Sequence, residues 1–237
     1  MIVGKIKEQI SNVSELQTGD VTIERFVAFL DIMGFKDFVA RNDHRVILEK
    51  LTTLTDFMSE TVGREHGFYF TMFSDSIMVY SDKSDEEAFS IIVYLISEIV
   101  RESISIGLPI KGAIAKGVCT ATTGEKLLYF GQPIIDAFKL EENLVIYGVA
   151  IHNTAEEEAI RLSKKKDFSM VYDYNVPLKS ASSNHYIINW YGDNIERTKC
   201  MLMEIRKTVS DFPRRYIDNT LKCISYVSSV NTTEDLK

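Results

Sequence analysis

Two carboxylate residues inside apolar, strand-like runs are the strongest candidates for chemistry in this chain. Asp31 ends the run of residues 26–31, and Asp75 interrupts the run of residues 70–80. A buried, unpaired carboxylate costs several kcal/mol, so a lone Asp in such a run would destabilise a core. A shared divalent cation would compensate both charges, and Mg²⁺ or Mn²⁺ prefers such hard oxygen ligands. The alternative is that each Asp is an ordinary turn or cap residue.

The overall composition limits the kinds of protein that this chain can be. Its 237 residues are 45% hydrophobic, enough for a substantial core. A net charge of −7 argues against nucleic acid as a main partner. Three widely spaced cysteines without a CxxC pair indicate reduced thiols. Because neither a signal peptide nor a membrane-spanning run is recognisable, we expect a cytoplasmic protein without membrane association.

The elements that must position the two aspartates alternate between strands and helices. Residues 25–31 are rich in β-branched and aromatic side chains and predict a strand. Residues 43–61 show helical spacing of apolar residues. Two further runs, 68–73 and 77–80, predict a β-hairpin with Asp75 at or near its tip.

The next segments complete a recognisable element order. Ser84 and Glu87 have the spacing of a capping box and predict a helix that runs to about residue 105. The elements predicted after it are a strand at 110–120, a helix at about 132–143 and a strand at 147–151. The order β-α-β-β-α-β, followed by α-β, predicts an α+β fold with a ferredoxin-like core, one face of its sheet covered by helices.

The remaining third of the chain predicts further α/β structure. The segments concerned are a charged helix at about 154–165, strands near 168–172 and 185–190, a helix with Asp193 and Glu196 in capping-box spacing, and a helix from about Pro213. We therefore expect an N-terminal arm at 1–24, a core at 25–152 and a C-terminal α/β extension with helices at 153–237, packed on the core.

Four segments resemble the catalytic domain of class III nucleotidyl cyclases over about residues 25–152. They are FLDIMGF at 29–35, SD at 74–75, KGAIAKG at 111–117 and FGQPIIDAFKLE at 130–141. Within that superfamily the chain is most similar to the pyrimidine cyclases of bacterial Pycsar antiphage defence, which make cyclic UMP or cyclic CMP. The closer likeness rests on the FLDIMGF and FSDSI segments and on VPLK and NW, at residues 176–179 and 189–190.

The resemblance implies a two-metal mechanism. Asp31 and Asp75 would be the metal aspartates, and the Ile32 carbonyl would be a further ligand for Mn²⁺ or Mg²⁺. The metals would activate the ribose 3′-hydroxyl for attack on the α-phosphate and neutralise the triphosphate, with release of pyrophosphate. The backbone that would cradle the phosphates is that of Met33, Gly34 and Phe35.

Side chains that depart from the superfamily pattern bear on the substrate. Lys111 and Lys139 take the places of a phosphate-binding Arg and a transition-state Arg, and a lysine acts there as a point charge. Purine cyclases read the base with polar residues at the positions of Thr71 and Leu128, and the usual Lys and Asp or Cys are missing here. Phe26 is a candidate to stack on a base. The resemblance favours UTP, with CTP as the second possibility.

The resemblance also implies partners. Class III cyclases build their sites across a head-to-tail dimer, so a homodimer is expected, with Asp31 and Asp75 from one subunit and Lys139 from the other. The cyclic nucleotide would activate a separate effector protein. Two alternatives stay open: a purine (adenylate or guanylate) cyclase with unusual base contacts, and a non-catalytic nucleotide-binding protein on the same fold.

Overall fold

Strands and helices alternate along most of the chain in the computed structural model, which describes residues 22–122, 127–165, 169–192 and 195–234. The elements of the first half are β1 (Thr22–Ile32), α3 (Phe35–Arg41), α4 (His44–Gly63), β2 (Phe68–Phe73), β3 (Ser76–Ser81), α5 (Glu86–Ser105) and β4 (Ile110–Ala121). Those of the second half are β5 (Tyr129–Gly131), α6 (Gln132–Asn143), β6 (Gly148–Ile151), η2 (Asn153–Ala155), α7 (Glu156–Ser163), β7 (Val171–Pro177), β8 (Ser182–Ile188), α8 (Ile195–Thr208) and α9 (Asp211–Glu234).

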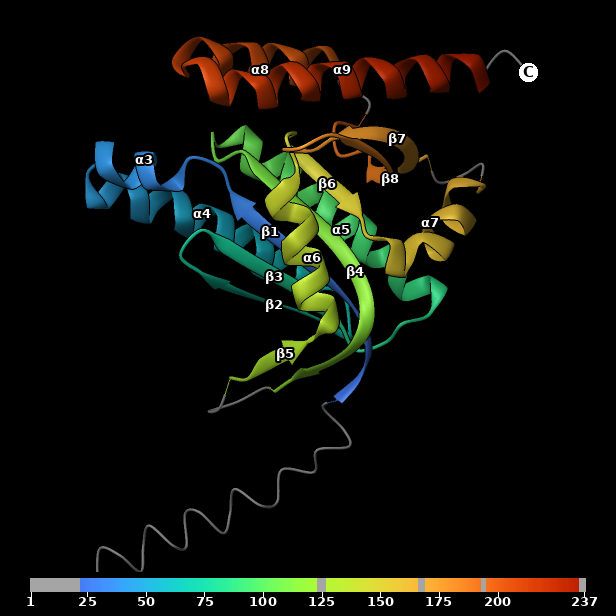
Figure 1. Ribbon diagram of the computed structural model, residues 1–237. Helices are drawn as coiled ribbons and strands as arrows, with labels where there is room; N and C mark the ends of the chain where they lie inside the picture. Colours follow the sequence, from blue (N-terminus) through green and yellow to red (C-terminus); the bar gives the residue numbers. More distant parts are fainter. Residues whose placement is uncertain (1–21, 123–126, 166–168, 193–194, 235–237) are drawn as a thin grey trace, which may run out of the picture.

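One mixed sheet is the framework of the molecule (Figure 1). Its strand order is β2-β3-β1-β4-β6-β8-β7, and β5 pairs with β4. The strand β1 is antiparallel to both of its neighbours, β3 and β4, whereas β4 and β6 run parallel. The strands β2-β3-β1-β4, with α4 and α5 as connections, form the predicted ferredoxin-like core. The predicted α+β fold class is therefore confirmed.

The side chains of β1 alternate between two covered faces of the sheet. Phe26 points to the face of α4 and α5, where its ring lies 5.1 Å from that of Phe89. Phe29 and Asp31 belong to the opposite face, which α6 crosses, and the Phe29 ring lies 5.4 Å from that of Phe138. Helices thus cover both faces, which corrects the expectation that they cover one face alone.

Three local features near the site differ from the sequence-based expectations. Helix α3 follows Gly34 directly, where φ of 73° turns the chain, and was not expected. The N-cap of α5 is Asp85, which accepts a hydrogen bond from the Ala88 amide at 2.8 Å. The predicted capping box of Ser84 is therefore wrong by one residue, because Asp is an equally good cap. The predicted cap at Asp193 lies outside the described residues.

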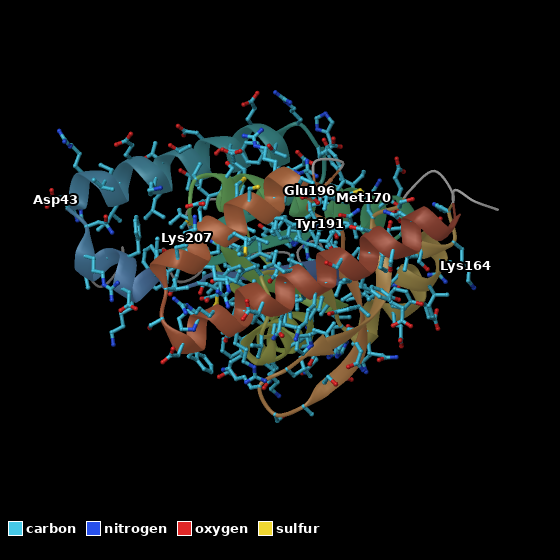
Figure 2. The ribbon with its side chains drawn as sticks, turned by 90° about the horizontal axis from the view of Figure 1, so that it is seen from above. Asp43, Lys164, Met170, Tyr191, Glu196 and Lys207 are labelled. Atoms are coloured by element: carbon cyan, nitrogen blue, oxygen red, sulfur yellow. The ribbon has the colours of Figure 1, made fainter. Side chains whose placement is uncertain are left out.

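Helices α8 and α9 form an antiparallel pair that lies across one end of the sheet (Figures 1 and 2). Figure 2 shows both helices crossing the top of the molecule, with Glu196 near the start of α8 and Lys207 near its end. One hydrophobic cluster extends from Phe26 in β1 to Val227 in α9, so the pair shares its core with the sheet. Among the described residues, no helix has the length and apolar character needed to cross a membrane.

Candidate active site

Asp31 and Asp75 lie at the same end of neighbouring strands. Asp31 is opposite Ser76 in the β1–β3 ladder, and Asp75 stands immediately before Ser76 in the two-residue turn between β2 and β3. The Ile32 amide donates a hydrogen bond to the Asp75 carbonyl oxygen over 2.9 Å. In that turn Ser74 has φ of 59°, a left-handed conformation that tight hairpins require. The predicted hairpin with Asp75 at its tip is confirmed.

The carboxyl group of Asp31 is half-buried beside other charges. Burial is the main reason why its pKa is raised to about 6, and the negative charges of Glu141 and Asp75 raise it further. The positive charge of Lys111 acts in the opposite direction. Three carboxyl groups and one ammonium group therefore form one electrostatic cluster at this end of the sheet.

Lys111 and Glu141 form a buried ion pair next to Asp31. Lys111 is the direct neighbour of Asp31 across the β1–β4 ladder. Its Nζ lies 2.7 Å from Glu141 Oε1, and the two side chains are 7% and 4% exposed. The same ammonium group donates to the backbone carbonyl oxygens of Glu141, at 2.7 Å, and Glu142, at 3.4 Å. These are the last carbonyls of α6, where a cation is favoured by the helix dipole.

These contacts correct the expected role of Lys111. An ammonium group has three N–H donors, and all three have acceptors here, so no donor of Lys111 remains for a phosphate. Sequence reasoning gave Glu141 no role beyond its place in a motif. The helical spacing of Glu141 with Ala137, Leu140 and Leu144 already indicated that it lies on the buried face of α6, and these residues are buried. A carboxylate at such a position must find a partner.

The donor set at the strand ends fits a divalent cation. Carboxylates outnumber the ammonium group, and the raised pKa of Asp31 shows that its negative charge is under-compensated. Asp31, Asp75 and the Ile32 carbonyl offer only oxygen donors, as Mg²⁺ and Mn²⁺ prefer. Within the described ranges, no group of three or more His, Cys, Asp or Glu residues could hold a metal ion by itself. Water molecules would complete the coordination, and phosphates would replace some of them when nucleotide is bound.

The residues expected around the phosphates and the base have different environments. The Met33 amide donates to the Pro109 carbonyl oxygen at 2.8 Å, so this amide is not available to a phosphate; the neighbouring Gly34 and Phe35 stand at the start of α3. Phe26 is 0% exposed in the core on the α5 face. Its expected role in stacking on a base is therefore wrong.

Thr71 lies on the same face of the sheet as Asp31. It is opposite Met78 in the β2–β3 ladder, and Met78 is opposite Phe29, two residues before Asp31. One row further along, Tyr69 stacks on Tyr80 with ring centroids 5.4 Å apart. The face behind the carboxylates is thus lined by apolar and aromatic side chains. Thr71 is the polar residue in the row that it forms with Met78 and Phe29.

Lys139 is exposed on α6. The charges that act on Asp31 within one chain come from Glu141, Asp75 and Lys111. Phe138, which precedes Lys139, and Ile135 expose large apolar side chains on the same helix. The fold of one chain therefore leaves Lys139 facing outward, on an apolar surface of α6.

Comparison with known proteins identifies solved structures with a similar fold. No family model matches the chain, and no curated protein matches it. Solved nucleotide cyclase structures match it over 70% to 86% of its length. The catalytic core of a rhodopsin-guanylyl cyclase with converted specificity, in complex with ATPalphaS, has a TM-score of 0.54 at 16% identity, covering 71% of this chain and 96% of that one.

Two further solved structures agree with this match. The guanylate cyclase domain of RhGC from Catenaria anguillulae, in complex with GTP, has a TM-score of 0.53 at 16% identity, covering 70% of this chain and 96% of that one. The adenylyl cyclase CyaB from P. aeruginosa has a TM-score of 0.50 at 19% identity, with 70% and 93% covered. The chain therefore has the fold of class III adenylyl and guanylyl cyclase domains.

Proposed function

We propose that this protein is a metal-dependent nucleotide cyclase that converts a pyrimidine nucleoside triphosphate, UTP in preference to CTP, into the 3′,5′-cyclic nucleotide and pyrophosphate. One observation carries the proposal. On a fold shared with nucleotide cyclase domains, Asp31 and Asp75 lie at one end of the sheet, where the amide of Ile32, the residue after Asp31, donates a 2.9 Å hydrogen bond to the Asp75 carbonyl oxygen and the Asp75 charge acts on the Asp31 carboxyl group. Two aspartates in this arrangement suit phosphoryl transfer better than a structural role.

Each group of the chain then has a defined task. Asp31, Asp75 and the Ile32 carbonyl would hold Mn²⁺ or Mg²⁺, which supplies charge neutralisation and lowers the pKa of the 3′-hydroxyl. The 3′-oxygen forms a bond to the α-phosphorus, the bond to the β-phosphate bridge breaks, pyrophosphate leaves and the hydroxyl proton passes to solvent. Lys139 of a second subunit would balance the charge that develops on the phosphates.

The substrate preference is supported by what lines the face behind the carboxylates. Thr71 and Leu128 stand where purine cyclases place charged or polar readers, and Met78 lies beside Thr71. Such a site offers few donors and acceptors to a purine edge, and a missing polar partner discriminates strongly between bases. A pyrimidine, with its smaller ring, is the base that we propose. The cyclic product would act as a second messenger on a separate effector protein in antiphage defence.

A homodimer is the assembly that we propose for the active enzyme. Large apolar side chains are exposed around β5 and α6; they are Leu127, Leu128, Phe130, Ile135 and Phe138. A surface of this kind is typical of a protein–protein contact. Two matched guanylyl cyclase domains from Blastocladiella emersonii are described as dimeric and as monomeric, so oligomeric state varies on this fold and needs direct measurement.

The decisive experiment is a product assay with each of the four nucleoside triphosphates and Mn²⁺. We expect cyclic UMP as the main product, a smaller amount of cyclic CMP, and loss of at least about 10³-fold in turnover for Asp31→Ala and Asp75→Ala. Asp56→Ala, which removes an exposed carboxylate of α4, is the matched control and should retain full activity.

Other results would contradict the proposal at defined levels. Cyclic AMP or cyclic GMP as the dominant product would identify a purine cyclase. Absence of pyrophosphate release from all four nucleotides would identify a non-catalytic protein. Turnover that survives in Asp31→Ala or Asp75→Ala would disprove the metal assignment.

A further inference from the structure

The C-terminal helix α9 is hydrogen-bonded to the segment that leads from α6 into β6. The Tyr147 amide donates to Thr220 Oγ1 at 2.8 Å, and this hydroxyl in turn donates to the Tyr216 carbonyl oxygen at 2.7 Å. One residue along the helix, Asn219 Nδ2 donates to the Val145 carbonyl oxygen at 2.9 Å. Thr220 is 1% exposed, so its two hydrogen bonds cannot be replaced by bonds to bulk water.

That segment connects Glu141 to the strand that lies beside Lys111. It begins where the Leu144 amide donates to the Glu141 carbonyl oxygen at 3.1 Å. It ends at Gly148, which is opposite Lys111 in the parallel β4–β6 ladder. A shift of residues 144–147 would therefore move Glu141 and Lys111 relative to each other. Because Lys111 is the ladder neighbour of Asp31, the same shift would reach the metal aspartate.

Ring packing strengthens the connection. Tyr216, one turn before Thr220, stacks on Tyr147 with ring centroids 6.0 Å apart and an interplanar angle of 21°. Tyr216 is 3% exposed. Burial raises its pKa, and the negative charges of Glu141 and Asp31 also act on its phenol, which places this turn of α9 beside the carboxylate cluster.

We propose that Thr220 is a positioning residue of the active site: through the Tyr147 amide, α9 holds residues 144–147 so that the Lys111–Glu141 pair stays aligned beside Asp31. The C-terminal helix is then a part of the catalytic unit rather than an appendage to it. This inference rests on the proposed metal-dependent function, because its consequence is the geometry of the Asp31 site.

The test compares Thr220→Val with matched changes in the same helix of the full-length protein. Thr220→Val keeps the shape of the side chain but removes the acceptor for the Tyr147 amide. Ser225→Ala also removes a hydroxyl that bonds the carbonyl four residues earlier, but Ser225 is exposed and its hydroxyl bonds within α9. Ile217→Val perturbs the buried face of α9 without affecting a hydrogen bond, and it serves as the control for lost stability. Thr220→Ser restores the hydroxyl.

Mn²⁺ affinity without nucleotide, measured from the free-ion signal in electron paramagnetic resonance, is the first readout. We expect Thr220→Val to weaken it by about tenfold, at the lower end of the roughly 10- to 100-fold cost of changes at outer positions around metal ligands. kcat with saturating Mn²⁺ and nucleotide should fall by a similar factor, while the KM for nucleotide changes little. Thr220→Ser should recover both values, and Ser225→Ala and Ile217→Val should match the unmodified protein.

The outcomes separate this inference from the proposed function. If Thr220→Val behaves like Ile217→Val in Mn²⁺ affinity and kcat, the positioning role is wrong, while the cyclase proposal is unaffected. If the unmodified protein binds Mn²⁺ but forms no cyclic nucleotide, the function fails, and a weaker affinity in Thr220→Val still supports the positioning role. If the unmodified protein binds no Mn²⁺ at all, both are overturned.

Discussion

At the scale of single residues, Asp31 is placed for binding rather than for stability. Its half-buried carboxyl group has a pKa raised from 3.8 to about 6, first by burial and then by Glu141 and Asp75. In the metal-free protein the folded state keeps a proton that the unfolded chain releases. This contribution to stability is fully present below about pH 3.8 and is lost as the pH rises through about 6. At neutral pH the ionised group therefore destabilises the metal-free fold.

We predict that Asp31→Asn stabilises the metal-free protein while it abolishes activity. A pKa shift of about two units corresponds to about 3 kcal/mol. Because the group is half exposed and partly screened by solvent, we expect a gain of about 1 to 2 kcal/mol at pH 7.5. Urea unfolding with a chelator present, between pH 4 and pH 8, measures this gain. The variant should also lose the fall in stability between pH 4 and pH 6.

An exposed carboxylate provides the control for Asp31→Asn. Asp56→Asn changes an exposed carboxylate on α4 and should leave the stability curve unchanged. If Asp31→Asn proved less stable than the unmodified protein at pH 7.5, its carboxylate would be making a favourable contact in the metal-free fold. The account of the site as under-compensated would then be wrong.

At the scale of elements, the Lys111–Glu141 pair joins β4 to the end of α6. The ion pair is buried on both sides and also satisfies the last carbonyls of the helix. Breaking such a pair by removing one partner is costly because the other charge stays buried, whereas replacing both partners with apolar residues is often nearly neutral. The pair thus fixes where α6 ends relative to Asp31.

We predict that Lys111→Met destabilises the protein by about 3 to 5 kcal/mol, since it leaves the Glu141 carboxylate buried and unpaired. The double variant Lys111→Met/Glu141→Leu should recover most of that loss, to within about 1 to 2 kcal/mol. Urea unfolding of the four proteins of this cycle gives the coupling energy.

A second lysine provides the comparison. Lys116 pairs with Glu158, but its side chain is 20% exposed, so Lys116→Met should cost less than Lys111→Met. If Lys111→Met left stability intact and only raised the KM for nucleotide, Lys111 would be a phosphate ligand after all. The assignment of the pair as structural would then have to be withdrawn.

At the scale of the whole molecule, one chain does not complete the proposed site. Asp31 and Asp75 lie at the sheet end, whereas Lys139 faces outward on α6 amid exposed apolar residues such as Ile135 and Phe138. A symmetric dimer that buries this surface would bring the α6 of each subunit to the partner's sheet. Each site would then combine residues from both chains.

We predict that two inactive variants restore each other when co-expressed. In a mixture of Asp31→Ala and Lys139→Ala subunits, half of the dimers are mixed and each mixed dimer holds one intact site. We therefore expect about a quarter of the unmodified activity. Cyclic nucleotide formation by the co-purified pair, carrying different tags, measures it.

The matched control uses two changes that would fall in the same half-site. Asp31→Ala with Asp75→Ala should show no recovery, because a mixed dimer then has no intact pair of metal aspartates. Recovery in this control, or none with Lys139→Ala, would contradict a shared site. Light scattering of the unmodified protein gives the oligomeric state independently.

Local patterns of residues along the chain were sufficient to predict most elements of the fold. The alternation of side chains in β1, the helical spacing of α4 and the hairpin around Asp75 all depend on neighbours in sequence, and the corresponding predictions are confirmed. Pro133 in the first turn similarly placed α6, whose bounds agree with those expected. The predicted start of a helix was wrong where two adjacent residues are equally good N-caps, as with Ser84 and Asp85 at the start of α5.

The amino-acid sequence by itself determined which residues carry charge inside apolar elements, and hence that Asp31 and Asp75 need an explanation. Only the tertiary structure decided which charges meet. Glu141 lies 30 positions after Lys111 in sequence, yet their side chains are 2.7 Å apart, and α9 contacts the segment of residues 144–147, which leads from Glu141 into β6, through Thr220. Such contacts depend on how strands and helices are packed, because burial and charge pairing act through space rather than along the chain.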